Sequence, residues 1–504
     1  MVWKKTISRG EHPVLLVDAL VSGMSEHAMR KLLDLDFSLK KYKRVSGASF
    51  MDEDEFNLLV SKIKERSNED KNYLNELTNN YVKTAKKLVA KAKSIYIFNF
   101  KGKSSSQINE MFIEFMEEYN QSTFFFYIPL FLEHLLEDEL NHEIGALLKK
   151  RRVDISLHQA LQVLCMPTKE TLRRKHTTDL LQIGKVITEN EKIKKEFNKR
   201  QELVILALKR YRKLNSLIKT HLEEYAWLHT YLFQIREYTV DEVVKELKEI
   251  LKENIDDELK IIKSVKADNA EKYKTMVEKL KIPPALIEKI QLVQEWNYLR
   301  SYRVDLYSMI HYYSNNLFQA VAVNLQLTYD ELLQLTYKEI VGIMKFGLFN
   351  RTVLESRRDG HGMLMEDGKA KVCTGYKLEE IKEQEKEPEK LKENKLYGTP
   401  AYSGNAEGKV HVVLDPYSKE NVKGFKKGDI LVARMTSTDY TPLIQKAGAI
   451  ITDEGGILCH ALVIAREFGI PCLVGTNVAT YFLKDGYTIK VNADEGYAKI
   501  IKKN

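Results

Sequence analysis

The spacing of apolar residues divides the chain into a long helical part and a shorter part built from strands. Over much of the first 376 residues, apolar positions recur at intervals of three and four, as in amphipathic helices. The segments with this pattern are 53–64, 71–93, 157–232 (broken near Pro167 and Asn215), 239–251 and 285–325. We therefore predict a mainly α-helical N-terminal region.

Short apolar runs between turn residues predict strands. In the first part they lie at 13–17, 42–46 and 95–100, and 363–373 reads as a hairpin turning at Asp367 and Gly368. After residue 397 they follow closely, at 398–404, 408–414, 428–433, 449–452, 470–475, 486–492 and 496–501. The fold class predicted is multidomain, with a C-terminal α/β domain of several strands and one or two helices.

A change in composition separates the two parts. Residues 377–395 are nearly all lysine and glutamate, with Pro388 among them. Such a segment is too polar to bury a core, and it predicts a charged linker that is partly helical or mobile. The expected organisation is a helical region at 1–376, a linker at 377–396 and a third unit at 397–504. The helical region forms either one unit or two subdomains, 1–150 and 151–376.

Composition excludes several classes of protein. The formal charge of +8 arises from lysine and glutamate interleaved along helices, which indicates solvated faces and no nucleic-acid partner. Four scattered cysteines fit a reducing cytoplasm and predict neither a disulfide framework nor a zinc site. The first residues lack the apolar core of a secretory signal. The most apolar run, 124–136, is too short to span a membrane.

The segment 449–476 carries the clearest chemistry. A buried strand is predicted at 449–452, and after Gly455 and Gly456 the residue His460 opens an amphipathic helix that stops at Gly469. Amide groups at a helix N-terminus hold phosphate, and glycines let it approach the chain. A neutral imidazole, with a pKa near ~6.5, is a good nucleophile at cellular pH. His460 is therefore a candidate phosphoryl acceptor.

The order of residues here resembles the phosphohistidine swivelling domain of phosphoenolpyruvate-utilising enzymes. The residues that carry the resemblance are Gly455-Gly456, His460-Ala461, Ala465-Arg466-Glu467, Gly469-Ile470-Pro471 and Val474-Gly475, preceded by 428–432 and 436–443. That family includes phosphoenolpyruvate synthase, pyruvate phosphate dikinase and rifampicin phosphotransferase. The resemblance covers about the last hundred residues and implies a layered β/β/α fold.

The resemblance also implies roles for individual residues. His460 is the residue that is phosphorylated, and the phosphate-binding candidates are Gly455, Gly456, Cys459 and Thr436. Cys459 stands where serine is frequent in the family, and we interpret it as a small hydrogen-bonding neighbour of His460. No metal ligand is predicted in this domain.

The family's catalytic modules, an ATP-grasp domain and a phosphoenolpyruvate barrel, have no counterpart in the sequence pattern. Three hypotheses follow. The chain is a phosphohistidine carrier charged by a separate ATP- or phosphoenolpyruvate-dependent protein, or a complete phosphotransferase with a hidden nucleotide site, or a non-catalytic scaffold. The cofactor is undetermined, since Mg²⁺ is expected only with a nucleotide- or phosphoenolpyruvate-binding partner. We prefer the carrier.

Two further side-chain groups have structural alternatives. His134, Asp138 and His142 share one helical face, where a polar surface is preferred over a metal site. A stripe along 296–312, which includes Arg300 and Arg303, could contact an anionic substrate or a partner domain. Helix packing with exposed arginine heads is the preferred interpretation.

Overall fold

The computed structural model describes residues 3–8, 12–231, 233–347, 349–383, 391, 394–414, 416, 419–436, 440–454, 461, 464–465 and 468–503. A long helical region precedes a C-terminal domain made mostly of strands, as the sequence predicts. The helices of the first region are α1 (Val14–Ser22), α2 (Glu26–Leu33), α3 (Glu53–Glu69), α4 (Tyr73–Tyr96), α5 (Ser105–Thr123), η1 (Phe125–Tyr127), α6 (Ile128–Arg151), α7 (Leu157–Leu164), α8 (Leu172–Thr188), α9 (Glu191–Phe197), α10 (Gln201–Leu208), α11 (Arg212–Tyr225), α12 (Val240–Ile250), α13 (Ile255–Leu280), α14 (Pro284–Asn324), α15 (Tyr329–Leu333), α16 (Tyr337–Phe346), α17 (Thr352–Arg358) and α18 (Gly375–Glu383).

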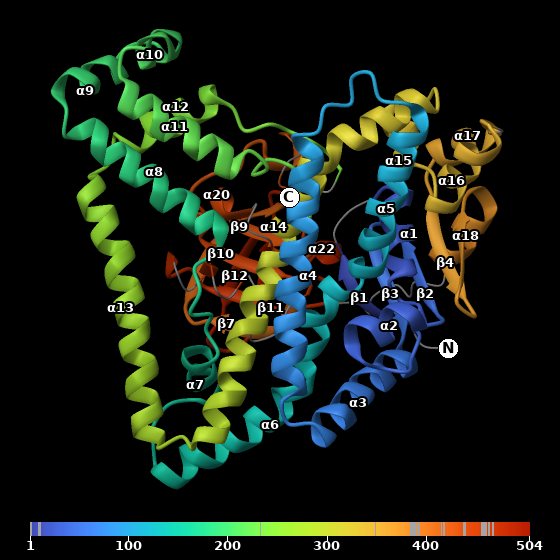
Figure 1. The fold of residues 1–504 in the computed structure, drawn as a ribbon. Helices are drawn as coiled ribbons and strands as arrows, with labels where there is room; N and C mark the ends of the chain where they lie inside the picture. The colour runs from blue at the N-terminus through green and yellow to red at the C-terminus, as the bar shows by residue number, and fades with distance from the viewer. Residues whose placement is uncertain are drawn as a thin grey trace.

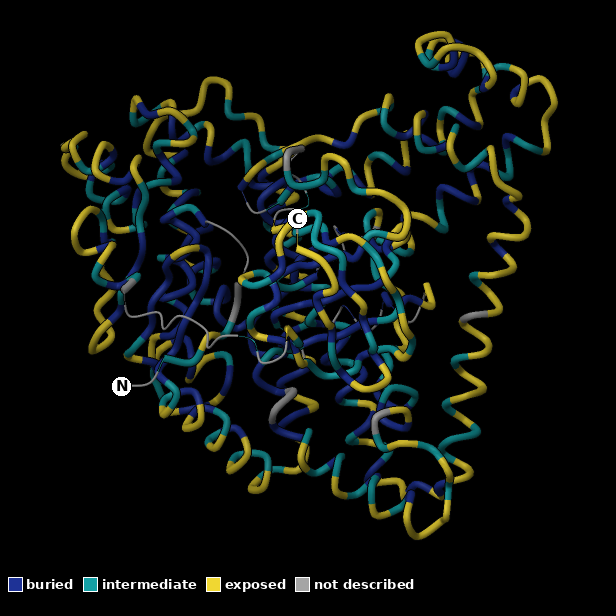
Figure 2. The backbone as a smooth tube through the Cα atoms, turned by 180° about the vertical axis from the view of Figure 1, so that it is seen from behind, coloured by how far each residue is buried: buried dark blue, intermediate teal, exposed yellow. Residues whose placement is uncertain are grey.

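The 41-residue helix α14 is the centre of the helical region. It packs along α4, where the indole of Trp296 donates to the hydroxyl of Thr78 at 3.0 Å. Figure 1 shows α13 and α8–α12 as an arm on one side of α4 and α14, and the N-terminal strands on the other. Seen from behind in Figure 2, the C-terminal domain lies between these two sides.

A five-stranded antiparallel sheet joins the beginning of the chain to the end of the helical region. Its order is β1 (Trp3–Ser8), β3 (Ala48–Asp52), β2 (Tyr42–Val45), β4 (Gly362–Glu366) and β5 (Lys369–Cys373). The predicted hairpin is confirmed, with positive φ at Asp367 and Gly368. Helix α18 packs on this sheet through the buried side chains of Leu378 and Ile381. The expectation that this part of the charged segment buries no core is therefore wrong.

Side-chain caps mark the starts of several helices. Capping boxes start α5 at Ser104, α12 at Thr239, α15 at Thr328 and α16 at Thr336, because each side chain accepts from an amide three residues on. A hydroxyl or carboxylate in this position satisfies an amide that the helix leaves unpaired, so the residue type marks the boundary.

Three local expectations were wrong. The run 13–17 belongs to helix α1, which is buried along most of its length, and a short run that is apolar on all sides has no period to distinguish helix from strand. The segment 95–100 forms the end of α4 and a loop, with no strand. The break expected near Asn215 falls at 209–211 instead, just before α11.

The C-terminal domain contains one mixed eight-stranded sheet. Its order is β6 (Lys395–Tyr397), β13 (Tyr497–Lys502), β12 (Thr488–Asn492), β8 (Asn405–Val412), β9 (Ile430–Ala433), β10 (Ala449–Thr452), β11 (Cys472–Val474) and β7 (Thr399–Tyr402). Strand β8 pairs with β12 through its first half and with β9 through its second, so it belongs to two halves of the sheet.

Alternate residues of the parallel strands enter two separate cores. Ile430 and Val432 face one core together with residues of β12 and β13, whereas Leu431 and Ala433 face the other. The second core is covered by helical residues, among them Ile444 of α20 (Thr441–Ile444) and Ala461. The two short helices α19 (Lys419–Val422) and α22 (Ala479–Phe482) complete the described elements. The predicted β/β/α layering is confirmed.

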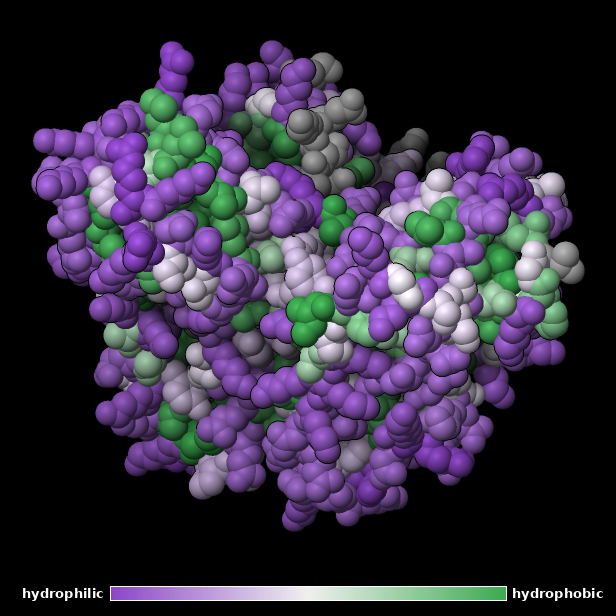
Figure 3. Space-filling view, turned by 45° about the horizontal axis from the view of Figure 1, so that its top comes forward, coloured by the Kyte–Doolittle hydropathy of each residue, from purple (hydrophilic) through white to green (hydrophobic). Residues whose placement is uncertain are grey.

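Figure 3 shows a largely hydrophilic face, on which hydrophobic residues form separate patches. Among the described helices, none combines the length and apolar composition needed to cross a bilayer.

A buried pair of histidines makes the helical arm sensitive to acid. The ring centroids of His176 and His221 lie 4.8 Å apart, and burial lowers the pKa of His176 to about 3 and of His221 to about 4. The unfolded chain takes up these protons near pH ~6.5, so stability is fully present above that pH and is lost as the pH falls. Burial raises the pKa of the Glu246 carboxyl to about 7. Between pH ~7 and ~4.5 the folded chain therefore binds this proton before the unfolded chain does, and stability from this group rises as the pH falls.

The two histidines outweigh the one carboxyl, so the free energy of unfolding should fall by about 1.4 kcal/mol per pH unit between pH ~6 and ~5. His221→Gln should remove most of this slope in urea titrations, and the exposed His27→Gln should leave it unchanged. Equal slopes in the wild type and His221→Gln would contradict this account.

Candidate functional site

The carboxyl ends of three parallel strands form one edge of the C-terminal sheet. Strands β9, β10 and β11 run in the same direction, so the segments that follow them leave from the same side. The pairing continues past the strands, since the amide of Asp453 donates to Ala433 O (3.1 Å) and that of Glu454 to Arg434 O (2.8 Å). Arg434 and Glu454, which follow β9 and β10, are therefore neighbours at this edge.

The predicted site residues are only partly within the described chain. Thr436 is buried, two residues beyond Arg434. His460, Gly455, Gly456 and Cys459 lie outside the described residues.

The helix predicted after His460 can be followed at four described positions. Ala461, Ile464, Ala465 and Phe468 are helical, and the chain leaves the helix at Gly469 with a φ of 65°. Ala461 and Ala465 are buried in the core under this helix.

Polar side chains fix the edge on both sides of β10. The hydroxyl of Thr452 donates to Glu454 O at 2.7 Å, and that of Thr476 donates to Thr452 O at 2.9 Å. The buried carboxylate of Asp453 accepts from the amide of Thr480 at 2.9 Å and from its hydroxyl. The Asp453 carboxylate thus satisfies an amide in the first turn of the short helix α22, which lies 26 residues further along the chain, so no local sequence signal marked this role.

This edge faces the N-terminal sheet. The Lys5 ammonium on β1 lies 3.6 Å from a carboxylate oxygen of Glu454, and the guanidinium of Arg434 donates to Ser46 O at 3.3 Å. A third contact joins the amide of Gln162, on α7, to Ala401 O on β7. Within the described residues, no hydrophobic cluster contains side chains from both regions. The described contacts that hold the domain here are therefore polar.

The ion pair between Lys5 and Glu454 gives a testable docking contact. Because Lys5 is 41% exposed and Glu454 16% exposed, the pair should contribute at most about 1 kcal/mol, or a several-fold change in the docked population. Lys5→Glu should shift small-angle scattering towards more extended molecules, and Lys5→Glu combined with Glu454→Lys should restore the wild-type curve. An unchanged curve for the single variant would exclude a role in docking.

The stripe on α14 proves to be structural. Trp296, Tyr307, His311 and Tyr312 are buried in helix contacts, as preferred. Arg303 differs from the expectation of an exposed head, because it is only 2% exposed and its guanidinium lies 4.4 Å from the ring centre of Tyr127. The spacing of residues 296–312 could not show that the ring of Tyr127, on another element, would cover Arg303.

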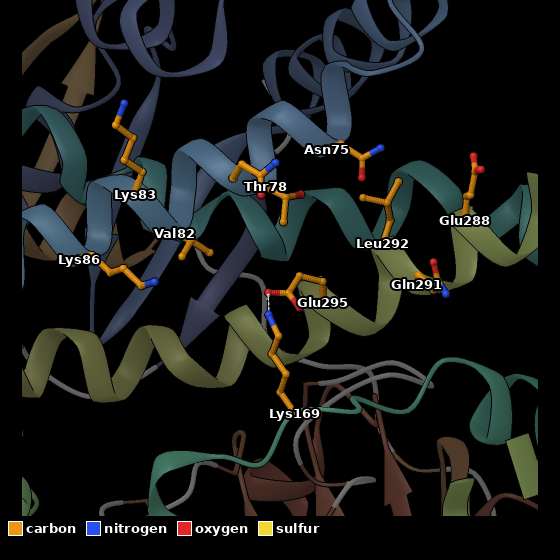
Figure 4. A pocket seen from close by; sticks show the side chains of 11 residues that line it. Asn75, Thr78, Val82, Lys83, Lys86, Lys169, Glu288, Gln291, Leu292 and Glu295 are labelled. Carbon is orange, nitrogen blue, oxygen red and sulfur yellow. Dashed lines mark hydrogen bonds and ion pairs between the residues drawn. The ribbon is translucent and has the colours of Figure 1, made fainter. Parts of the chain in front are cut away.

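A polar groove of about 650 Å³ lies between α4 and α14. Lys83 and Lys86 of α4 line it, and Lys169 reaches Glu295 of α14 at 2.6 Å (Figure 4). The side chain of His134, one of the metal candidates on α6, is outside the described set. Where side chains are described, no group of three or more histidine, cysteine, aspartate or glutamate residues could hold a metal ion.

The C-terminal domain is similar in sequence to parts of known proteins. Residues 425–496 match the family described as "PEP-utilising enzyme, mobile domain". A probable phosphoenolpyruvate synthase from Archaeoglobus fulgidus is 44% identical over 119 residues, which cover 23% of this chain and 15% of that protein. The chain thus matches only a small part of this relative.

Rifampicin phosphotransferases are also similar. The Bacillus subtilis protein is 30% identical over 34% of this chain and 19% of its own length. The Bacillus cereus protein is 26% identical over 242 residues, covering 46% of this chain and 27% of its own length. This alignment is longer than the whole segment 397–504, so it must include part of the helical region.

Two solved structures align with about a fifth of the chain. A crystal structure of Thermococcus kodakaraensis aconitase X is 25% identical, with 21% of this chain and 98% of that chain covered and a TM-score of 0.18. A solution structure of a UPF0107 protein is 22% identical, with 21% and 99% covered and the same TM-score. At this TM-score neither alignment supports a conclusion.

Proposed function

Because residues 425–496 form a PEP-utilising enzyme mobile domain, we propose that this chain is a phosphotransferase that works through a phosphohistidine at His460. The structural observation that supports this best is the common edge of β9 and β10. There the amide of Glu454, the last described residue before the segment that contains His460, donates to the carbonyl of Arg434, two residues before the buried Thr436. Ligands of parallel α/β sheets bind outside the carboxyl ends of the strands.

The chemistry follows from the residue types. A ring nitrogen of His460 attacks the donor phosphorus in line, the new N–P bond replaces the donor's P–O bond, and the ring proton passes to solvent. The amides of the Gly455-Gly456 turn and of Cys459, together with the Thr436 hydroxyl, would hold the phosphoryl oxygens.

We propose that a separate ATP- or phosphoenolpyruvate-dependent protein, acting with Mg²⁺, supplies the phosphoryl group. In the part of the chain that the structure describes, one sheet is antiparallel and the other mixed, with no barrel of parallel strands. The polar contacts at Lys5 and Arg434 suit a domain that leaves its docking surface to meet such a partner.

The acceptor is proposed to bind the helical region. The Bacillus cereus rifampicin phosphotransferase alignment extends into that region, and so supports a shared function beyond the mobile domain. Rifampicin is accordingly the first organic acceptor to test, and pyruvate, from the synthase relatives, is the second.

The test is phosphate transfer to the purified chain. It is incubated with radiolabelled ATP or phosphoenolpyruvate and Mg²⁺, with and without lysate of the source cells, and acid-labile, base-stable label is counted. Label that requires lysate supports the carrier. Label from a pure donor would mean that the helical region holds a nucleotide or phosphoenolpyruvate site. No label on folded protein would contradict phosphotransfer and favour the scaffold hypothesis.

A further inference from the structure

We propose that the cavity bounded by α15, α17, α18 and the turn between β2 and β3 binds the phosphoryl acceptor, an uncharged or zwitterionic compound with a free hydroxyl group. We call it the Arg358 cavity, and its volume is about 660 Å³, within the range of small-molecule sites. Leu354 and Leu378 give it apolar walls, while Arg358 and His361 line its polar side. This inference rests on the proposed phosphotransfer through His460.

The position of the cavity beside the mobile domain is the first argument. Ser46 lines the cavity, and its carbonyl accepts the hydrogen bond from Arg434. The carbonyl of Arg434 in turn accepts from the amide of Glu454, the last described residue before the segment that contains His460. The two hydrogen bonds therefore link the cavity wall to the sheet edge at Glu454, after which the chain continues to His460.

The balance of charges defines the class of acceptor. Three cationic side chains line the cavity, Arg357, Arg358 and Lys382, and three anionic ones, Asp330, Glu331 and Asp359. A polyanionic ligand would meet the carboxylates as well as the cations, and burying it there would cost free energy. An uncharged or zwitterionic ligand has no net charge, so the balanced charges of the lining neither attract nor repel it as a whole.

Some of these charges are already paired. The buried guanidinium of Arg357 binds the carboxylate of Glu339 at 2.9 and 3.0 Å, and Glu331 pairs with Arg351 at 3.2 Å. Arg358 is exposed, and apart from a longer-range electrostatic interaction with Glu331 it makes no hydrogen bond or ion pair to any residue the structure describes. Its guanidinium is thus the cation available for a ligand or for phosphoryl oxygens.

His361 is suited to remove the hydroxyl proton. Its Nε2 lies 3.1 Å from the carbonyl oxygen of His12, and because a carbonyl only accepts, Nε2 must carry the ring proton. The other nitrogen, Nδ1, is then the basic one in the neutral imidazole. As the acceptor's O–P bond forms, the hydroxyl proton passes to Nδ1 and the N–P bond of phosphohistidine breaks. The freed nitrogen of His460 then takes a proton from solvent, and His361 releases to solvent the proton that it took from the hydroxyl group.

The experiment separates discharge of the phosphohistidine from its formation. Protein labelled in the presence of lysate is desalted and mixed with a small-molecule extract of the same cells, split by ion exchange into an uncharged and an anionic fraction. Loss of label and the labelled product are followed in wild type, His361→Asn, Arg358→Ala and Lys86→Ala. Lys86→Ala is the control, because it removes a cation from the groove between α4 and α14.

The uncharged fraction should speed the loss of label at least tenfold. His361→Asn should lower that discharge rate about a hundredfold, as expected for loss of a general base, and should flatten its pH profile. Arg358→Ala should raise the amount of extract needed for half-maximal rate, and all variants should charge like wild type. Discharge by the anionic fraction alone, by neither fraction, or equally in wild type and both cavity variants would overturn the proposal. Failure to charge would instead contradict the proposed function.

Discussion

Replacement of His460 by alanine is expected to abolish the acid-labile label completely, whatever donor charges the wild type. Alanine has no nucleophile, and no neighbouring group in the predicted motif can form a phosphoramidate in its place. The measurement is the phosphate transfer assay described above, scored by stability of the label in base and its loss in acid. The fold should survive, because the change removes only atoms beyond Cβ.

A second histidine of the same domain provides the matched control. His411 lies on β8, its Nε2 is 3.1 Å from Asn421 O, and it is remote in sequence from the predicted motif. His411→Ala should keep the label, and thereby separate loss of the acceptor nitrogen from damage to the domain. Full labelling of His460→Ala would refute the assignment of the phosphorylated residue. Loss of label in both variants would point to damage to the domain.

The C-terminal domain was the easier part to predict, for a physical reason. Its strands are short apolar runs separated by glycine-containing turns, and both faces of β9 and β10 are buried, so the signal is local and dense. Sequence pattern therefore located β9, β10 and β11 within two residues, whereas the choice of His460, which lies outside the described residues, stays a prediction. The sequence could not show that β8 pairs with β12 along its first half and with β9 along its second, because its apolar pattern does not change between the two halves.

Long-range pairing escaped prediction in the helical region. Strand β2 pairs with β4, bringing Arg44 opposite Met363, and no local pattern links positions more than three hundred residues apart. The contact between Lys5 and Glu454 depends on the same non-local assembly. So does the Arg358 cavity, since Arg358 and His361 are adjacent in sequence but acquire their surroundings from the turn at Ser46 and from α18. Candidate residues that lie in one motif can be proposed from sequence, whereas those assembled from several elements cannot.

Gly408→Ala is expected to destabilise the C-terminal domain by about 3 kcal/mol. A Cβ at this position of β8 would lie 2.5 Å from the carbonyl oxygen of Gly428, and one at Gly448 would lie 2.6 Å from the same oxygen. That oxygen cannot retreat easily, because the amide of its own residue is bonded to Lys446 O at 2.8 Å. The two glycines thus allow β8 and β10 to pack against the turn that leads into β9.

Because the hydrophobic cores of the two regions are separate, the loss should appear in one unfolding transition only. Urea titration followed by labelling of wild type and Gly408→Ala would resolve it: the variant should lose phosphoryl acceptance at lower urea, while the helical signal unfolds as before. The control is Gly342→Ala in α16, where no atom lies within 4 Å of the new Cβ and helix propensity favours alanine by up to about 1 kcal/mol. Equal midpoints for Gly408→Ala and wild type would mean that the sheet can shift to accept the methyl group, and that close packing at Gly428 does not stabilise this domain.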